Sequence, residues 1–312
     1  MAYCFLIEGA AQRRITAVLD DFTPFDLQRD GVRIHGRRGG QGAPLLLLHG
    51  HPQTHVIWHR VAPLLAAHFT LVMIDLRGYG DSGRPDPGER HVAYSKREMA
   101  LDALAAMRHF GFDRFDVLAH DRGARVAHRL AADHASAVHR LMLLDIAPTL
   151  AMYEGTGEEF ARAYWHWFFL IQPPPLPEAL IESDPARYVR SVMGGRHAGL
   201  APFAPEALAE YERCMALPGA AQALCEDYRA SAGIDLDHDR ADVAAGMRLG
   251  QPLRVLWGAH GIVGRCFDVL ALWRERANAV SGGALPCGHY IPEEAPEALA
   301  REALTFFKDP TS

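Results

Sequence analysis

The feature that most constrains the fold is a strand–turn–helix pattern at residues 115–131. Residues 115–119 (FDVLA) form an apolar run, and residues 124–131 (ARVAHRLA) have the composition of a helix. The four residues between them leave room only for a sharp turn. This is the position and shape of a nucleophile elbow, the strand-to-helix turn that presents a reactive side chain in the pattern G-x-S-x-G. Here Ala119 replaces the first glycine, and Asp121 replaces the serine.

An aspartate at this turn changes the chemistry that the turn can support. Asp121 needs no base to become a nucleophile, because the exposed N–H groups and the dipole of a helix N-terminus keep a carboxylate ionised. It can displace a leaving group from carbon and form an ester with the remaining fragment. Water must then cleave that ester, so a base is required for the second step.

The composition is that of an ordinary globular protein, with 49% hydrophobic and 22% charged residues among 312. This length allows one large α/β domain with an insertion, or two domains. A net charge of -6 provides no basic field for nucleic acid or an anionic membrane. The five cysteines contain no C-x-x-C pair, which predicts free thiols in a cytoplasmic protein. The apolar patch at residues 3–7 is too short for a signal peptide or a membrane span, and no other run approaches that length.

Apolar runs alternate with helical segments on both sides of the elbow. The predicted strands are residues 45–49, 69–74, 115–119, 141–144, 253–257 and 284–286, and the predicted helices are residues 58–68, 94–110, 266–277 and 296–307. Such alternation predicts an α/β fold with a doubly wound, mostly parallel sheet. Ligands bind at the carboxyl ends of the strands in these sheets, where Asp121 and Asp145 both stand.

The character of the sequence changes after residue 147. Residues 148–245 contain aromatic and helical patterns, three consecutive prolines and no clear strand. We interpret them as a helical cap inserted between a first core part, 1–147, and a second core part, 246–312.

A histidine and a second carboxylate complete a catalytic set. His289 follows the last predicted strand and precedes the last helix, so it can take a proton from the water that attacks the Asp121 ester. The alternative is a surface-loop histidine, one of 17. Asp145 is the better orienting acid for His289, because residues 257–264 after the next strand contain no carboxylate. A turn or cap residue is the alternative for Asp145. The order nucleophile, acid, histidine is that of the α/β-hydrolase family.

Backbone N–H groups are expected to hold the oxyanion of the ester's tetrahedral intermediate. One belongs to Arg122, directly after the nucleophile, and the other to His51 in the loop after the first predicted strand. The His51 side chain is open to two interpretations, a contact with substrate or a bystander.

Arg122 and Arg125 point to an anionic substrate. They lie three residues apart at the start of one helix and therefore share a face. Two guanidinium groups beside a nucleophile suit a small carboxylate held bidentately. The alternatives are an ion pair between Arg125 and a nearby acid, and a solvated Arg122.

This chain resembles the fluoroacetate (haloacetate) dehalogenases of the α/β-hydrolase superfamily, from about Gly31 to the C-terminal helix. The motifs that carry the resemblance are LLLLHGHPQT (45–54), DLRGYGD (75–81), HDRGAR (120–125), LDIAP (144–148), AYWHWF (163–168), DYRA (227–230) and Gly288-His289. The resemblance implies that Asp121 attacks the carbon bearing the halogen and that His289 with Asp145 hydrolyses the ester. It also implies that Arg122 and Arg125 hold the substrate carboxylate.

The resemblance further implies a halide pocket formed by His166, Trp167 and Tyr228. Imidazole, indole and phenol donors would stabilise the charge that grows on a departing fluoride in the transition state. The alternative is a cap helix that packs its aromatic side chains. His51 stands where the family usually has a bulky apolar residue, which leaves the preferred halogen and acid open.

The expected substrates are therefore a short 2-haloacid and water. No cofactor or metal is expected, because the histidines are scattered without metal-ligand spacing. A homodimer is the candidate assembly. An epoxide hydrolase is the main alternative, with cap tyrosines as acids (Tyr228, Tyr164 and Tyr153). A haloalkane dehalogenase and a serine esterase fit less well, because of the two arginines and the absent serine. A non-catalytic ligand-binding protein on this fold is a further alternative.

Overall fold

The computed structural model describes residues 18–308 of the chain. An eight-stranded sheet forms its centre, in the strand order β1-β2-β4-β3-β5-β6-β7-β8. Strand β2 is antiparallel to both β1 and β4, and all the other neighbouring pairs are parallel. The strands are β1 Thr23–Arg29, β2 Val32–Gly40, β3 Ala43–Leu48, β4 Phe69–Ile74, β5 Phe115–His120, β6 Val138–Leu144, β7 Leu253–Gly258 and β8 Val280–Leu285. The predicted α/β class and mostly parallel sheet are confirmed.

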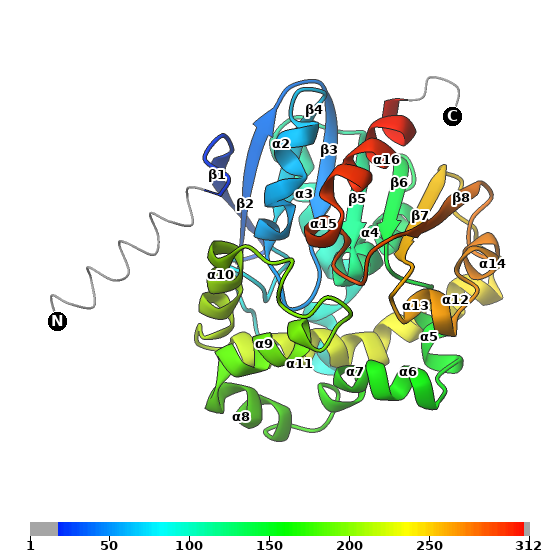
Figure 1. The fold of residues 1–312 in the computed structure, drawn as a ribbon. Coiled ribbons are helices and arrows are strands. Elements are labelled where there is room, and N and C mark those ends of the chain that lie inside the picture. Colours follow the sequence, from blue (N-terminus) through cyan, green and yellow to red (C-terminus); the bar gives the residue numbers. More distant parts are fainter. Residues whose placement is uncertain (1–17, 309–312) are drawn as a thin grey trace, which may run out of the picture.

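Alternate residues of the central strands face opposite sides of the sheet. In β3, Leu46 and Leu48 join an apolar cluster with α3 and α4, whereas Leu45 and Leu47 join a second cluster with α2 and α16. Both faces are therefore buried, as the continuous apolar runs predicted. Figure 1 shows the helices in layers over the two faces. The core helices are α2 Ala62–Leu65, α3 Lys96–His109, α4 Asp121–Asp133, α13 Val263–Cys266, α14 Val269–Arg274, α15 Ile291–Glu294 and α16 Pro296–Lys308, with 3-10 helices η1 His55–Arg60 and η2 Glu89–Tyr94.

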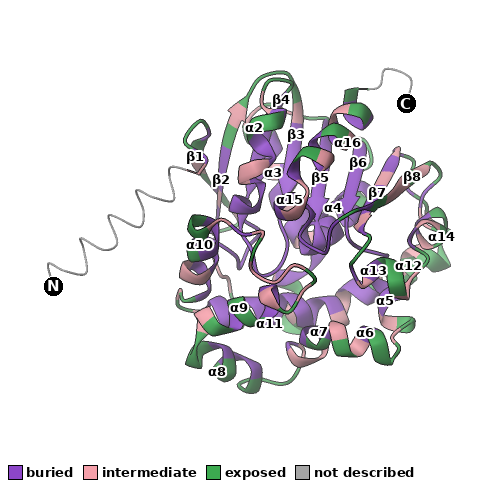
Figure 2. Ribbon diagram, viewed as in Figure 1, coloured by how far each residue is buried: buried purple, intermediate pink, exposed green. Residues whose placement is uncertain are grey.

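Between β6 and β7 the described chain forms helices alone. They are α5 Thr149–Glu154, α6 Glu158–Ala163, α7 Trp165–Phe169, α8 Leu176–Ser183, α9 Pro185–Gly194, α10 Pro205–Met215, α11 Ala220–Ala232 and α12 Ile234–Ala244. These helices, called the cap below, gather at one end of the sheet (Figure 1). Their outer surfaces are exposed and their inner surfaces are buried (Figure 2). The division at residues 148 and 245 itself stays a prediction.

The hairpin of β1 and β2 was not predicted from the sequence. Its strands form one edge of the sheet and alternate between exposed and buried residues, so they lack the continuous apolar runs of the central strands. Within residues 18–308 no helix is long and apolar enough to cross a membrane. The prediction made for the apolar patch at residues 3–7 lies outside the described residues.

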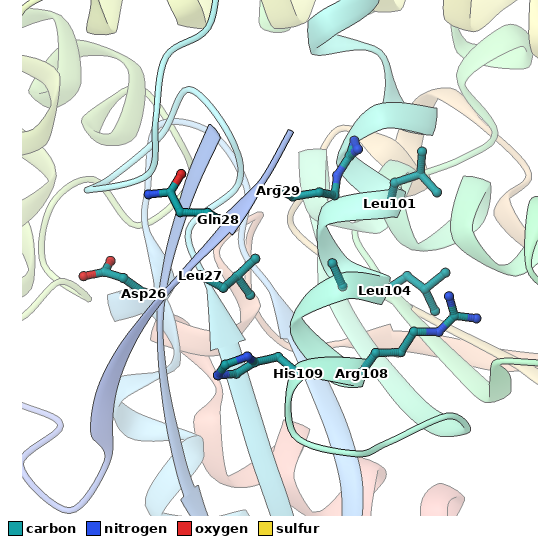
Figure 3. Close-up of a pocket in the computed structure, with 9 residues that line it drawn as sticks. Asp26, Leu27, Gln28, Arg29, Leu101, Leu104, Arg108 and His109 are labelled. Atoms are coloured by element: carbon teal, nitrogen blue, oxygen red, sulfur yellow. The ribbon is translucent and has the colours of Figure 1, made fainter. Parts of the chain in front are cut away.

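A broad hollow of about 740 Å³ separates β1 from α3 at this edge. Figure 3 shows Leu27 and Leu104 in its wall, with Arg108 and His109 beside them. Neither β1 nor α3 carries a residue of the predicted catalytic set, so this hollow is separate from the predicted catalytic site.

Candidate active site

The elbow holds Asp121 at the junction of β5 and α4 in a strained backbone conformation. Its φ angle is 45°, which a residue with a side chain rarely adopts. Gly123 anchors the turn, since its N–H donates to the His49 carbonyl at 2.8 Å. A Cβ atom at position 123 would lie 2.4 Å from that oxygen, so only glycine fits there. The buried Ala119 replaces the first glycine of the pattern without disturbing this geometry.

The loop after β3 meets the nucleophile directly. The His51 N–H donates to Asp121 Oδ2 at 3.0 Å. Gly50 permits this approach, because a Cβ atom there would lie 2.5 Å from the Asp121 Cβ. The second predicted oxyanion donor, the N–H of Arg122, lies in the first turn of α4, where N–H groups have no partner within the helix. Both predicted donors are thus beside Asp121.

The site favours the ionised form of the nucleophile. Burial alone would raise the pKa of Asp121, but the charges of His289, His120, Arg125 and Arg122 outweigh it and hold that pKa well below its usual range. The carboxylate is therefore ready to attack without a base.

The predicted base and its acid form a hydrogen-bonded pair. His289 Nδ1 donates to Asp145 Oδ2 at 2.6 Å, and the Gly258 N–H donates to Asp145 Oδ1 at 3.0 Å. Asp145 itself has a positive φ of 53° directly after β6. His120 Nε2 donates to the His289 carbonyl at 2.8 Å and so fixes the backbone of the loop that carries His289. Because Nδ1 of His289 is occupied, Nε2 is the nitrogen that can accept a proton from water.

Arg122 donates its side-chain hydrogen bonds to residues of the cap. Its Nε and Nη2 atoms donate to the two carboxylate oxygens of Asp227, each at 2.8 Å, and Nη2 also donates to Ser231 Oγ. The guanidinium lies 4.1 Å from the centre of the Tyr228 ring. Nη1 is buried and has no hydrogen-bond partner within residues 18–308. One nitrogen of Arg122 therefore remains for a substrate.

Arg125, like Arg122, has some nitrogens bound within the protein and one nitrogen without a partner among residues 18–308. Nη1 donates to Thr149 Oγ1 at 2.8 Å, Nη2 contacts Met152 Sδ at 3.2 Å, and the guanidinium lies 4.7 Å from the centre of the Trp167 ring. Its Nε is buried without a partner in the described part of the chain. Burial and the charge of Arg122 lower the pKa of Arg125 below its ordinary value.

Two residues of the predicted halide pocket, His166 of α7 and Tyr228 of α11, lie in one buried aromatic cluster, and Trp167 joins it through Tyr164. The halide pocket itself stays a prediction. The His166 ring lies 6.0 Å from the Tyr228 ring, and Tyr164 lies within 6 Å of both His166 and Trp167. Trp167 Nε1 and the Tyr228 hydroxyl are buried and lack a partner among the described residues. Two donors without a partner among the described residues are therefore present in this cluster.

The His51 side chain belongs to the same aromatic cluster. Its ring stacks 5.7 Å from His166, and its Nε2 lies 3.2 Å from the Tyr188 hydroxyl. Burial lowers the pKa of His51 to about 3, so the ring is neutral. Nδ1 has no partner within the described chain and faces a buried environment.

Two residues that the sequence did not single out also contribute to the site. Asp227 was quoted only as part of a motif, yet it orients Arg122. Arg196, in the loop after α9, lies 4.6 Å above the Tyr164 ring and borders a cavity of about 350 Å³ that includes His289. No periodicity or spacing distinguishes Arg196, because it stands in a loop.

A set of metal-ligand residue types comes together elsewhere, although the sequence spacing did not suggest one. One atom each of His35, His55 and Asp75 lies within 4.8 Å of the others. Both oxygens of Asp75 already accept hydrogen bonds, one from His55 Nδ1 and the other from the Asp81 N–H. The group is thus satisfied as a hydrogen-bond network that fixes the loop after β4.

Comparison with known proteins assigns the chain to a family. Residues 43–203 match the family described as alpha/beta hydrolase fold. The chain belongs to the α/β-hydrolase family.

Its relatives include two kinds of hydrolase. The chain is 42% identical to a fluoroacetate dehalogenase from Burkholderia sp. over 90% of its own length and 92% of that protein. It is 36% identical to a soluble epoxide hydrolase from Corynebacterium sp. (strain C12), over 89% and 94% of the two chains. A solved structure of an alpha/beta hydrolase from Nostoc sp. PCC 7120 has a TM-score of 0.90 and 53% identity, over 92% and 98% of the chains. The predicted membership of the dehalogenase family is confirmed.

Proposed function

We propose that this protein hydrolyses the carbon–halogen bond of a short 2-haloacid and releases the 2-hydroxy acid. The observation that carries the proposal is the pair of buried guanidinium groups beside Asp121, each with one nitrogen that lacks a partner within residues 18–308. A buried donor without a partner is costly, and a substrate carboxylate would satisfy both. An epoxide offers no such group.

The first step uses the two oxygens of Asp121 differently. Oδ2 accepts the His51 N–H, so Oδ1 is the oxygen free to attack the carbon that bears the halogen. A carbon–oxygen bond forms as the carbon–halogen bond breaks, and the halide leaves with the bonding electrons. Trp167 Nε1 and the Tyr228 hydroxyl are the donors available to the departing halide.

The second step cleaves the ester. His289 Nε2 takes a proton from water while Asp145 stabilises the imidazolium through Nδ1. The hydroxide adds to the Asp121 carbonyl carbon, and the oxyanion that forms lies at the N–H groups of His51 and Arg122. Collapse expels the 2-hydroxy acid, whose oxygen recovers the proton from His289. The proton that remains on the Asp121 carboxyl is released to solvent, which regenerates the carboxylate.

Epoxide hydrolysis is the second candidate, and one observation favours it. The hydroxyls of Tyr153 and Tyr228 are both buried and without a partner in the described chain. Two such phenols could protonate an epoxide oxygen while Asp121 opens the ring. The 36% identical relative named as a soluble epoxide hydrolase supports this reading.

The test is halide release from fluoroacetate and chloroacetate, measured side by side with Asp121→Asn as the blank. Release of either halide that is lost in the variant is the expected result. Chloride release alone would retain the mechanism and exclude efficient cleavage of the carbon–fluorine bond. No release from either acid, together with diol formation from an epoxide panel, would overturn the proposal.

A further inference from the structure

Arg196 is a cation of the site that the reaction above does not use. Its guanidinium lies 4.6 Å from the centre of the Tyr164 ring, and Nη1 donates to the Ala163 carbonyl at 3.3 Å. Its charge acts on His166, because burial and the charge of Arg196 together hold the pKa of His166 well below its ordinary value. Asp121 is among the groups that stabilise the charged form of Arg196.

Arg196 forms no direct ion pair among residues 18–308, although the charges of Asp121 and Asp145 act on it from a longer distance. Across residues 18–308, no acidic side chain lies within ion-pair distance of Arg196, whereas Arg122 pairs with Asp227. Arg265, on the rim of the same cavity, pairs with Glu159. Arg196 is therefore the unpaired arginine of the cavity, and an anion there would gain a full charge partner.

The cavity beside Arg196 is larger than a two-carbon acid requires. Its volume of about 350 Å³ lies in the range of pockets that hold drug-sized ligands. It extends from His289 and Tyr164 to His197, His260 and Gly261 at the junction of cap and core. Because His289 lines it, this space lies next to the predicted base.

Arg196 and Arg125 pack on different rings of an aromatic pair. Arg125 packs on the Trp167 ring at 4.7 Å, the Trp167 and Tyr164 rings are 5.7 Å apart, and Arg196 packs on Tyr164. Each guanidinium therefore has its own aromatic support. The site therefore offers two anion positions, and the field of each reaches Asp121.

We propose that Arg196 binds a second carboxylate of the substrate, so that the preferred substrate class is a 2-halodicarboxylate such as 2-chlorosuccinate. This inference rests on the proposed function. The carboxylate next to the halogen-bearing carbon occupies Arg125 and Arg122, and the distal carboxylate extends along the cavity to Arg196. The bonds made and broken are those of the two steps above. The products are chloride, a proton and the 2-hydroxydicarboxylate.

The kinetic test compares 2-chlorosuccinate with chloroacetate. For the unmodified protein we expect a higher kcat/KM on the dicarboxylate, and Arg196→Gln should lower the ratio of the two values at least tenfold. Arg196→Lys should restore part of the ratio, since it keeps the charge. Arg265→Gln is the matched control on the same rim and should leave the ratio within twofold. An equal loss on both acids in Arg196→Gln would overturn the inference, as would a preference for chloroacetate in the unmodified protein.

A binding test separates this inference from the proposed function. In the Asp121→Asn background, which lacks the nucleophile, malate should bind at least tenfold more tightly than glycolate by calorimetry. Adding Arg196→Gln should remove that advantage. If no haloacid is turned over but the malate preference depends on Arg196, the proposed reaction fails and the dicarboxylate site stands. Equal affinities for malate and glycolate would reject the dicarboxylate site.

Discussion

Asp121 differs from a free carboxylate because each of its oxygens has a separate environment. The His51 N–H holds Oδ2 at 3.0 Å, and neighbouring positive charges keep the group ionised. In the proposed second step the same N–H would hold the oxyanion of the tetrahedral intermediate. One backbone donor would thus orient the nucleophile before attack and stabilise the oxyanion after it.

Separating the two steps gives the first prediction. His289→Asn removes the base and leaves the attacking oxygen in place, so displacement should proceed and ester hydrolysis should stop. Intact-mass spectrometry after incubation with chloroacetate should find the protein heavier by one substrate fragment. Asp121→Asn, lacking the nucleophile, is the control and should remain unmodified. An unmodified His289→Asn protein with full turnover would contradict the assignment of the base.

Gly50 provides the second prediction at this scale. An alanine there would place Cβ 2.5 Å from the Asp121 Cβ and 2.9 Å from Oδ2, so the nucleophile must move. A displacement of about 1 Å can cost on the order of a hundredfold in rate. Gly50→Ala should therefore lose at least tenfold in kcat for halide release and keep its circular dichroism spectrum. Gly250→Ala, with no atom within 4 Å of the added methyl group, should behave like the unmodified protein.

At the scale of elements, a buried charge network joins the cap to the core. Asp227 of α11 contacts Arg122 of α4 and Lys96 of α3, and it accepts a hydrogen bond from the Tyr79 hydroxyl. Burial would raise the pKa of Asp227, but Arg122 and Lys96 lower it well below its ordinary value. The network therefore fixes the cap helix and the orientation of Arg122 together.

Neutralising that carboxylate is the third prediction. Asp227→Asn would leave two buried cations with one weak acceptor, and breaking such a pair costs about 3–5 kcal/mol of stability. We expect that loss in urea denaturation and a higher KM for chloroacetate, because Arg122 loses its orientation. Asp237→Asn removes only exposed ion pairs, with Arg90 and with Arg240, and should leave the stability nearly unchanged. Equal stability of the two variants would show that the network does not hold the cap.

Which elements the sequence predicts depends on their position in the sheet. The central strands have both faces buried and read as continuous apolar runs, so β3 to β7 were predicted within a few residues. The edge hairpin of β1 and β2 alternates and was missed. Asp121 and Asp145 were predicted as site residues because each directly follows a strand, and His289 because it lies in the loop between the last strand and the last helix. The partner of Arg122 lies 105 residues away in the cap, and Arg196 lies in a loop, so neither contact has a local signal.

Over the whole molecule, the cap and core also meet at a buried acid. Glu293 of α15 accepts a hydrogen bond from the Tyr211 hydroxyl of cap helix α10 at 2.6 Å. Gln53 Nε2 lies 3.5 Å from the same oxygen, and His59 Nδ1 lies 3.7 Å from the other. Burial raises the pKa of Glu293 from 4.5 to about 8. The folded protein therefore holds a proton there at neutral pH.

That proton makes the contribution of Glu293 to stability fall as the pH rises, which is the fourth prediction. Between about pH 4.5 and 8 the unfolded chain has released the Glu293 proton and the folded protein retains it, so this contribution to the free energy of unfolding decreases with pH. Each pKa unit corresponds to about 1.4 kcal/mol, which gives a change of about 5 kcal/mol over the whole range. Glu293→Gln keeps an acceptor for Tyr211 and carries no titrating proton.

The measurement is urea denaturation of the protein and of Glu293→Gln at pH 5.5, 7 and 8.5. Taking the difference between the two proteins cancels every other group that titrates in this range. The variant should gain stability relative to the unmodified protein as the pH rises, and the difference should level off above pH 8. Glu297→Gln, at an exposed position of α16, is the control and should follow the unmodified protein at each pH. If Glu293→Gln also runs parallel to it, Glu293 is ionised in the folded state. The contact between α15 and α10 would then join a charged carboxylate to the Tyr211 hydroxyl.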